Sequence, residues 1–330
     1  MDPRPASPLA ALETLDGYRR LFMDPLLWRP FVQQVCTRHG FPCLVIRPGR
    51  AGSFPTFIVE QQRVVKFFGR LFDGETGWRV EEEAAGLMAG LPEIPAAPLL
   101  ASGRLENEPG WHYLVFAYLP GASFGELRAQ VSFPDKLALA RWLGTALRRL
   151  HAVKLPSRTT LPRLTATKLR TWSAGRKQEG LPGWPEGLRR QVDGYLASSI
   201  LPVKPGAAHF IHADLTADHL LGELENGTWK TRGIIDFGDA LRGNIFYELA
   251  ALHLDLFAGD RRLLAAFLET YLLSPDDRQD FSRKAMSIAL MHQFDVFAPL
   301  FARQPKLAEI PTLEELAVHL WEVSTDEVMD

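Results

Sequence analysis

The stretch from His212 to Ala240 reads HADLTADHLLGELENGTWKTRGIIDFGDA, and it decides the fold. The pair Asn226-Gly227 lies between two strand-like runs and favours a two-residue hairpin turn. The runs are His219–Glu223 and Thr228–Asp236. Asp214 precedes the first run and Asp236 ends the second, so a hairpin is expected to bring both carboxylates to the same edge.

Two carboxylates at one edge suit phosphoryl transfer. One carboxylate orients the attacking hydroxyl and accepts its proton, and the other holds the magnesium ion that bridges the nucleotide phosphates. His-x-Asp and Asp-Phe-Gly are each common by chance, whereas the ordered pair on either side of a hairpin is far more specific.

The same stretch resembles the catalytic and metal loops of the kinase superfamily. His212-Ala213-Asp214, together with Gly243-Asn244 and Tyr247–Ala250, is similar to the aminoglycoside-phosphotransferase branch. The resemblance implies that Asp214 is the catalytic base and Asp236 the principal magnesium ligand, with ATP or GTP as phosphoryl donor. It also implies an α+β, bilobal, protein-kinase-like fold with a small antiparallel-sheet N-lobe and a larger, mostly helical C-lobe.

His219 departs from the pattern, because the family usually has Asn five residues after the catalytic Asp. Magnesium prefers oxygen ligands, and imidazole suits softer metals. His219 is therefore either a poor magnesium ligand, a ligand better suited to manganese, or a residue that only makes hydrogen bonds nearby. In the last case Asp218 or water would replace it at the metal.

A kinase also needs a strand lysine that holds the phosphates and a helix glutamate that orients this lysine. Lys66, in the apolar run Val64–Phe68, is the candidate lysine. Helical periodicity points Glu82 away from the apolar face and cannot separate Glu81 from Glu83. The family's Glu-Ala-x-x-Leu pattern resembles Glu83 and the residues after it, so the resemblance favours Glu83.

Three further nucleotide contacts are expected. The turn material from Gly49 to Ser53 lies where a phosphate-covering turn belongs, which makes Ser53 a candidate. The segment Leu114–Leu119 is similar to the connector whose backbone binds adenine, which makes Ala117 and Tyr118 candidates.

Hydrophobic periodicity predicts mixed strands and helices up to about residue 120 and mainly helices after it. We therefore expect an N-terminal nucleotide-binding lobe over residues 1–118 and a catalytic and substrate-binding lobe over 119–330. Expected helices cover residues 25–39, 78–91, 135–153, 246–257, 261–273 and 281–300, and expected strands before the hairpin cover 43–47, 56–60, 63–68 and 111–118.

Bulk properties exclude several classes of protein. A net charge of -2 gives no basic field for nucleic acid or an anionic membrane. Cys36 and Cys43 are too few for a disulfide framework, which fits a reducing, cytoplasmic setting. No signal peptide or membrane-spanning run is expected. The oligomeric state is left open.

The excess of acidic residues after Ala240 suits either a cationic substrate or a solvated helical surface. Asp255, His292 and Asp295 are candidate substrate contacts on C-terminal helices. Glu248 shares a helix face with Asp255, although a buried structural partner is the simpler role for it.

Several segments resemble hygromycin phosphotransferase of the 7''-hydroxyl-modifying type, a family of antibiotic-resistance enzymes. They include Asp16-Gly17-Tyr18, Leu252-His253-Leu254 and Phe294–Phe297. The resemblance implies an aminoglycoside such as hygromycin B as substrate. Two alternatives stay open: a kinase of another hydroxylated metabolite, and a non-enzymatic nucleotide-binding module.

Overall fold

The computed structural model describes residues 7–50, 52–199, 201–202 and 208–323, and the chain forms two compact units. Unit 1 contains Met1–Gly121, Arg158–Thr160 and Arg232–Asp239. Unit 2 contains Ala122–Ser157, Leu161–Thr231 and Ala240–Asp330. The expected second lobe, 119–330, includes residues 232–239, whereas in the structure this segment, which contains Asp236, packs with unit 1.

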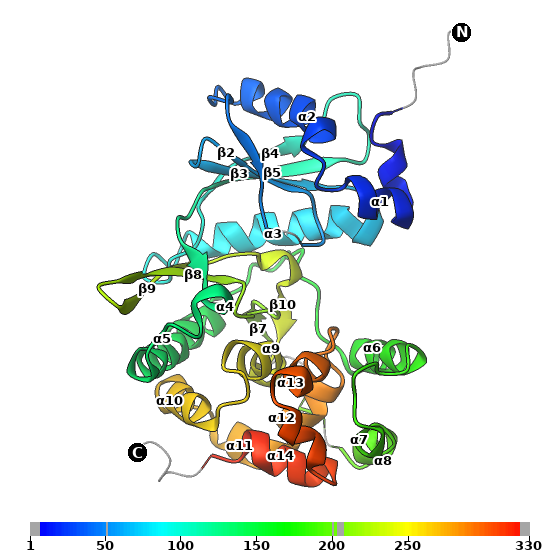
Figure 1. Cartoon of the computed structure of the whole chain (residues 1–330), viewed down its shortest axis with the longest axis vertical. Coiled ribbons are helices and arrows are strands. Elements are labelled where there is room, and N and C mark those ends of the chain that lie inside the picture. Colours follow the sequence, from blue (N-terminus) through cyan, green and yellow to red (C-terminus); the bar gives the residue numbers. More distant parts are fainter. Residues whose placement is uncertain (1–6, 51, 200, 203–207, 324–330) are drawn as a thin grey trace. The chain divides into compact units, whose positions relative to one another are not determined.

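Unit 1 is built on a five-stranded antiparallel sheet with the order β1-β2-β3-β5-β4 (Figure 1). Its strands are β1 (Ile46–Pro48), β2 (Thr56–Val59), β3 (Arg63–Phe68), β4 (Leu99–Arg104) and β5 (His112–Ala117). The sequence did not predict β4, because Ala101, Ser102 and Gly103 give it neither an apolar run nor a clear alternation.

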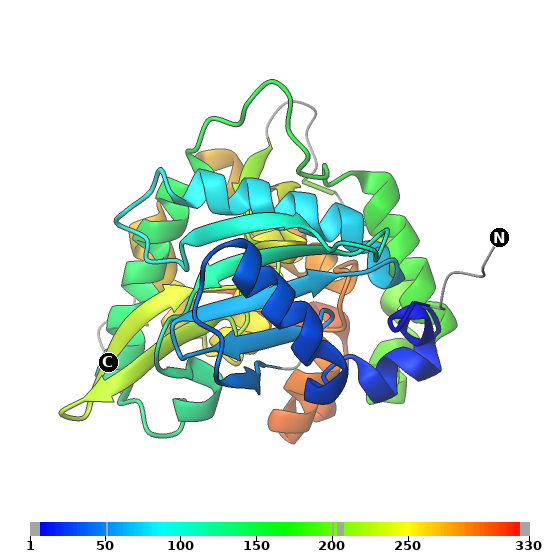
Figure 2. The ribbon, with the colours of Figure 1, turned by 90° about the horizontal axis from the view of Figure 1, so that it is seen from above.

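Alternation along β3 sends its side chains to two different layers. Val65 and Phe67 join the core beneath α2 (Pro25–Arg38), where the Trp28 ring stacks 4.6 Å from the Phe67 ring. Phe68 packs on the opposite face, beneath α3 (Gly74–Met88). Figure 2 shows the sheet between these two helices. Lys66 has the same parity as Phe68, so it points toward α3.

Glycines fix the start of α3 close to the end of β3. A Cβ atom at Gly74 would lie 2.0 Å from the carbonyl oxygen of Gly69, and a Cβ at Gly69 would lie 2.4 Å from the Trp111 ring. Neither approach leaves room for a side chain. The first turn of α3 can therefore lie against the backbone that follows β3, which sets the position of the glutamates further along the helix.

Unit 2 is mainly helical, and Figure 1 shows α9 within it, together with α5, α10 and α12. Its α-helices are α4 (Phe124–Leu127), α5 (Phe133–His151), α6 (Ala166–Gln178), α7 (Glu186–Arg189), α8 (Val192–Ala197), α9 (Ile245–Ala251), α10 (Arg261–Tyr271), α11 (Pro275–Arg278), α12 (Phe281–Leu290), α13 (Phe297–Arg303) and α14 (Leu313–Trp321). Two short strands, β7 (His209–Ile211) and β10 (Leu241–Gly243), pair antiparallel. The loop that contains Asp214 follows β7 directly.

The predicted hairpin is confirmed. Strands β8 (Leu220–Glu225) and β9 (Thr228–Ile234) are neighbours in a three-stranded sheet with β6 (Ala122–Ser123). Asn226 has φ 52° and Gly227 has φ 81°, and a tight turn with two left-handed residues is the reason for the Asn-Gly pair.

Two helix predictions need correction. The predicted helix 281–300 is two helices, because the chain leaves helical geometry between Leu290 and Phe297. Residues 155–185, which lie outside all the expected helices, contain α6. In addition, the end of the predicted helix 246–257 winds as a π-helix over Leu252–Leu256.

Two further findings apply to the residues that the structure describes. None of the helices there combines the length and the apolar character that crossing a membrane requires. Cys36 and Cys43 are both free thiols.

Trp28→Ala should destabilise the protein by roughly 3–5 kcal/mol, because it opens a cavity among the rings of Phe57, Phe67 and Trp111. Urea unfolding measures the free-energy change. Leu26→Ala on the same helix is the control, since Leu26 is 82% exposed and its loss should matter by less than about 0.5 kcal/mol. Equal effects of the two substitutions would contradict this account of the core.

Candidate active site

Lys66 is the centre of a buried ion cluster in unit 1. Its Nζ atom lies 2.7 Å from Oε2 of Glu81 and 2.7 Å from Oδ1 of Asp236. Lys66 is 7% exposed and Glu81 4% exposed, and the rings of Phe54 and Phe68 lie within 5.7 Å of the ammonium group. A buried ammonium needs such partners, because isolated burial of a charge is very costly.

The carboxylates decide the protonation of this cluster. Burial alone would lower the pKa of Lys66, but the nearby carboxylates of Asp236 and Glu81 hold it above its ordinary value, so Lys66 is an ammonium. Burial raises the pKa of Glu81 to about 7; the Lys66 ammonium opposes this rise, and the Asp236 carboxylate adds to it. Two carboxylates therefore share one cation.

The expectation that Glu83 orients Lys66 is wrong, because Glu81 does so. Glu83 instead accepts a hydrogen bond from the backbone N–H of Thr160 at 2.6 Å. Both glutamates border the apolar face of α3, and Glu81 is the one directed under the sheet with Val80, Ala84 and Met88. Periodicity left both open, and the resemblance selected the wrong one; burial in the folded protein was needed to separate them.

Asp236 lies two residues after the end of β9 in a strained backbone conformation, with φ 64°. Non-glycine residues uncommonly adopt this left-handed region, Asp more often than most, and functional sites are one place where such residues gather. A Cβ atom at Gly238 would lie 3.3 Å from Oε2 of Glu81 and 3.4 Å from Oδ1 of Asp236. A side chain there would lie against both carboxylates, so the glycine of Asp-Phe-Gly leaves the space beside them open.

The residues of unit 1 that were expected to contact the nucleotide already use some of their backbone groups in hydrogen bonds within unit 1. The carbonyl oxygen of Ser53 accepts a hydrogen bond from the Tyr18 hydroxyl at 2.5 Å. The N–H of Ala117 donates to Pro98, and the N–H of Tyr118 donates to Gln62. Because both amides are used inside the protein, a base could meet Ala117 or Tyr118 only through other backbone atoms. Ala51, within the expected turn, lies outside the described residues.

In unit 2, the loop that contains Asp214 is held by a buried carboxylate. Oε2 of Glu248 accepts hydrogen bonds from the backbone N–H groups of His212 at 2.8 Å and Ala213 at 3.2 Å. Burial alone would raise the pKa of Glu248, but the side chains of His151 and His212 and the hydrogen bond from Ala213 hold it below its ordinary value. Ala213 has φ 71°, so the residue before Asp214 is also left-handed.

His219 contacts the backbone of the predicted base. Its Nδ1 atom lies 2.6 Å from the carbonyl oxygen of Asp214 and 3.6 Å from the Asp214 carboxylate. Because a carbonyl oxygen only accepts, Nδ1 carries the proton and donates it. Neutral His219 therefore has its lone pair on Nε2. The neighbouring Asp218 accepts a hydrogen bond from the Ser123 hydroxyl at 2.9 Å.

The residues present suit a magnesium ion that is held mainly by a bound nucleotide. Within the described part of the chain, no group of three or more His, Cys, Asp or Glu residues could hold a metal ion by itself. Magnesium is commonly bound by one or two carboxylates, water and substrate phosphates, without a complete protein cage. The Asp236 side chain, which is 37% exposed, can supply such an oxygen.

Asp255 is neutralised by two arginines. Its carboxylate lies 2.9 Å from Nη1 of Arg303 and 3.7 Å from Nη2 of Arg128, and it accepts a hydrogen bond from the N–H of Ala217. Asp255 therefore holds the loop after Asp214, and the two guanidinium groups leave it little charge to offer a cationic substrate.

The other two predicted substrate residues also have protein partners. His292 is fully buried and donates from Nε2 to the carbonyl oxygen of Ala213 at 3.2 Å; burial lowers its pKa to about 4, so it is neutral. Asp295 accepts hydrogen bonds from Trp184 and from the first amides of α13. Their contact with a substrate stays a prediction.

Comparison with known proteins identifies the class to which this fold and these residues belong. Residues 46–283 match the phosphotransferase enzyme family. The chain belongs to this family and is a phosphotransferase.

Individual proteins that resemble the chain share little of its sequence. The GDP and kanamycin complex of the aminoglycoside phosphotransferase APH(2'')-IIia has a TM-score of 0.66 and 20% identity, covering 88% of this chain and 98% of that chain. A microcompartment-associated aminopropanol kinase has a TM-score of 0.58 and 14% identity, covering 89% and 100%. Lysine-specific demethylase JMJ21 of Arabidopsis thaliana is 22% identical over 271 residues, which are 64% of this chain but only 28% of that protein. The structural matches confirm the bilobal, kinase-like fold.

Glu81→Gln should lower kcat/KM for the nucleotide by about 10- to 100-fold, because the loss of one charge-assisted hydrogen bond to Lys66 costs roughly 1.5–3 kcal/mol. Steady-state kinetics at varied nucleotide concentration measure it. Glu83→Gln is the matched control on the same helix and should change kcat/KM by less than about two-fold. A larger loss for Glu83→Gln than for Glu81→Gln would restore Glu83 as the orienting residue.

Proposed function

We propose that the protein is an O-phosphotransferase that transfers the γ-phosphoryl group of ATP or GTP to a hydroxyl of a small molecule. The observation that carries the proposal is the ion cluster of Lys66, Glu81 and Asp236, since a buried lysine that is oriented by two carboxylates suits the binding of nucleotide phosphates. The family match supports the reaction class.

In the proposed reaction, the Asp214 carboxylate accepts the proton of the acceptor hydroxyl as its oxygen attacks the γ-phosphorus. The bond between that phosphorus and the β–γ bridging oxygen breaks, and the nucleoside diphosphate leaves. Lys66 holds phosphate oxygens and offsets their charge. A magnesium ion held by Asp236, with Asp218 or His219 as further candidates, would neutralise charge on the phosphates.

We propose an aminoglycoside, such as hygromycin B, as the acceptor. Support comes from the structural similarity to an aminoglycoside phosphotransferase with bound kanamycin and from the acidic excess after Ala240. A kinase of another amino alcohol is the second candidate, because an aminopropanol kinase shares the fold. A third candidate, a nucleotide-binding module without turnover, is motivated by His219 in place of the usual asparagine.

Asp214→Asn should lower kcat by about 10²-fold or more, because it removes the proton acceptor and leaves the loop backbone in place. The assay supplies ATP or GTP with magnesium or manganese and a panel of aminocyclitols and amino alcohols, and mass spectrometry detects the phosphorylated product. Asp193→Asn is the control, since the Asp193 side chain is 81% exposed. Unchanged turnover in Asp214→Asn excludes this residue as the base, and nucleotide binding without transfer to any acceptor favours the third candidate.

His219→Asn should retain or improve magnesium-dependent kcat/KM, whereas His219→Ala should lose activity. The amide nitrogen of Asn can take the place of Nδ1 as donor to the Asp214 carbonyl, and its oxygen is a harder ligand than imidazole; Ala offers neither. The ratio of manganese- to magnesium-dependent kcat/KM should also fall in His219→Asn. A large loss in His219→Asn with both metals would show that the imidazole has a specific role.

A further inference from the structure

The N-terminal helix α1 (Leu15–Leu21) lies outside residues 46–283, which match the family, yet it contacts the turn between β1 and β2. Its position is well fixed. The Thr14 side chain caps the first turn, and a Cβ atom at Gly17 would lie 1.9 Å from the carbonyl oxygen of Ala11. Only glycine allows this close packing of α1 against the preceding 3₁₀ turn.

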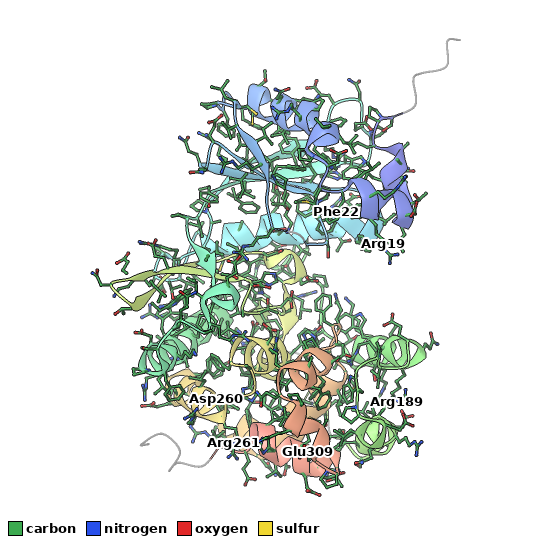
Figure 3. All side chains as sticks on the ribbon, in the orientation of Figure 1. Arg19, Phe22, Arg189, Asp260, Arg261 and Glu309 are labelled. Atoms are coloured by element: carbon green, nitrogen blue, oxygen red, sulfur yellow. The ribbon has the colours of Figure 1, made fainter. Side chains whose placement is uncertain are left out.

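Tyr18 on α1 reaches the turn directly. Its hydroxyl donates to the carbonyl oxygen of Ser53 at 2.5 Å, and the residue is only 5% exposed. The Tyr18 ring stacks on Phe22 at 5.3 Å and meets the edge of Phe72 at 5.3 Å. Phe22 lies at the end of α1 (Figure 3). The ring contacts hold the phenol group in place, so its hydroxyl is a fixed anchor for the turn.

The same turn leads into the lysine cluster. Phe54, the residue after Ser53, packs on Phe68 at 4.8 Å, and its ring lies 5.7 Å from Nζ of Lys66. Burial raises the pKa of Tyr18, and the Lys66 ammonium partly opposes this rise, which agrees with their closeness. The end of the turn is therefore held on one side by the Tyr18 hydroxyl and lies beside Lys66 on the other.

We propose that Tyr18 is a positioning residue whose hydroxyl holds the end of the turn, at residues 52–54, in the conformation that receives the nucleotide phosphates. The proposal rests on the proposed function, because it assigns phosphate binding to this turn and to Lys66. A glycine such as Gly52, with open space around it, allows many backbone conformations, and all but one must be given up when a ligand is bound. An anchor on a rigid helix reduces this entropic cost before the nucleotide arrives.

Tyr18→Phe tests the proposal, because it removes the hydroxyl and keeps the ring. We expect the nucleotide Kd, measured by calorimetry, to rise about 3- to 10-fold, as the loss of one hydrogen bond predicts. At saturating nucleotide, kcat should change less than about two-fold. The variant should fold, because Ser53 is exposed and water can replace the hydroxyl at its carbonyl oxygen.

Tyr113→Phe is the matched control in unit 1. Tyr113 on β5 is 1% exposed, and its hydroxyl lies 2.9 Å from Nε2 of His39, the residue that follows α2. Removal of this hydroxyl should lower stability and leave nucleotide affinity unchanged. A purely structural role for Tyr18 predicts the same behaviour in both variants.

Hydrogen exchange of the nucleotide-free proteins gives a second readout. The amides of the turn at residues 52–54 should exchange faster in Tyr18→Phe than in the wild type, and not in Tyr113→Phe. If the wild type binds nucleotide and Tyr18→Phe matches Tyr113→Phe in Kd and exchange, the proposal is overturned and the proposed function stands. If the wild type binds no nucleotide, the proposed function fails, and the role of Tyr18 fails with it.

Discussion

The ammonium group of Lys66 is the constraint on which the organisation of unit 1 depends. It lies on the face of β3 that packs under α3, where water cannot solvate it, so the fold must bring carboxylates to it. Glu81 comes from α3, and Asp236 comes from a segment that follows Lys66 by 170 residues. A strand, a helix and a distant loop are thus tied at one point. Such a cluster contributes more to unique geometry than to stability.

In unit 2, carboxylates likewise hold the loop that contains Asp214, here by accepting hydrogen bonds from its backbone amides. Buried Glu248 accepts two amides just before Asp214, and Asp255 accepts the amide of Ala217 just after it. The loop is therefore fixed at both ends by carboxylates from one continuous helical segment. The left-handed backbone at Ala213 and at Asp236 is the strained geometry that such surroundings maintain.

The sequence was most informative where local chemistry decides the structure. Asn226-Gly227 predicted its hairpin because two left-handed residues are needed there, and the apolar run around Lys66 predicted the strand on which it lies. The choice between Glu81 and Glu83 depends on how far α3 is rotated against the sheet. That rotation is set by packing, which includes the contact of Gly74 with Gly69, and no local pattern encodes it.

The positions of α1 and α2 show where the folded unit begins along the chain. The family match begins at residue 46, but the rings of Phe57, Phe67 and Trp111 are covered by Trp28, which precedes it. A chain cut at residue 46 would present this aromatic face to water and invite aggregation. The segment that matches the family, residues 46–283, is therefore shorter than the segment that folds together. Domain boundaries taken from sequence similarity alone would divide one hydrophobic core.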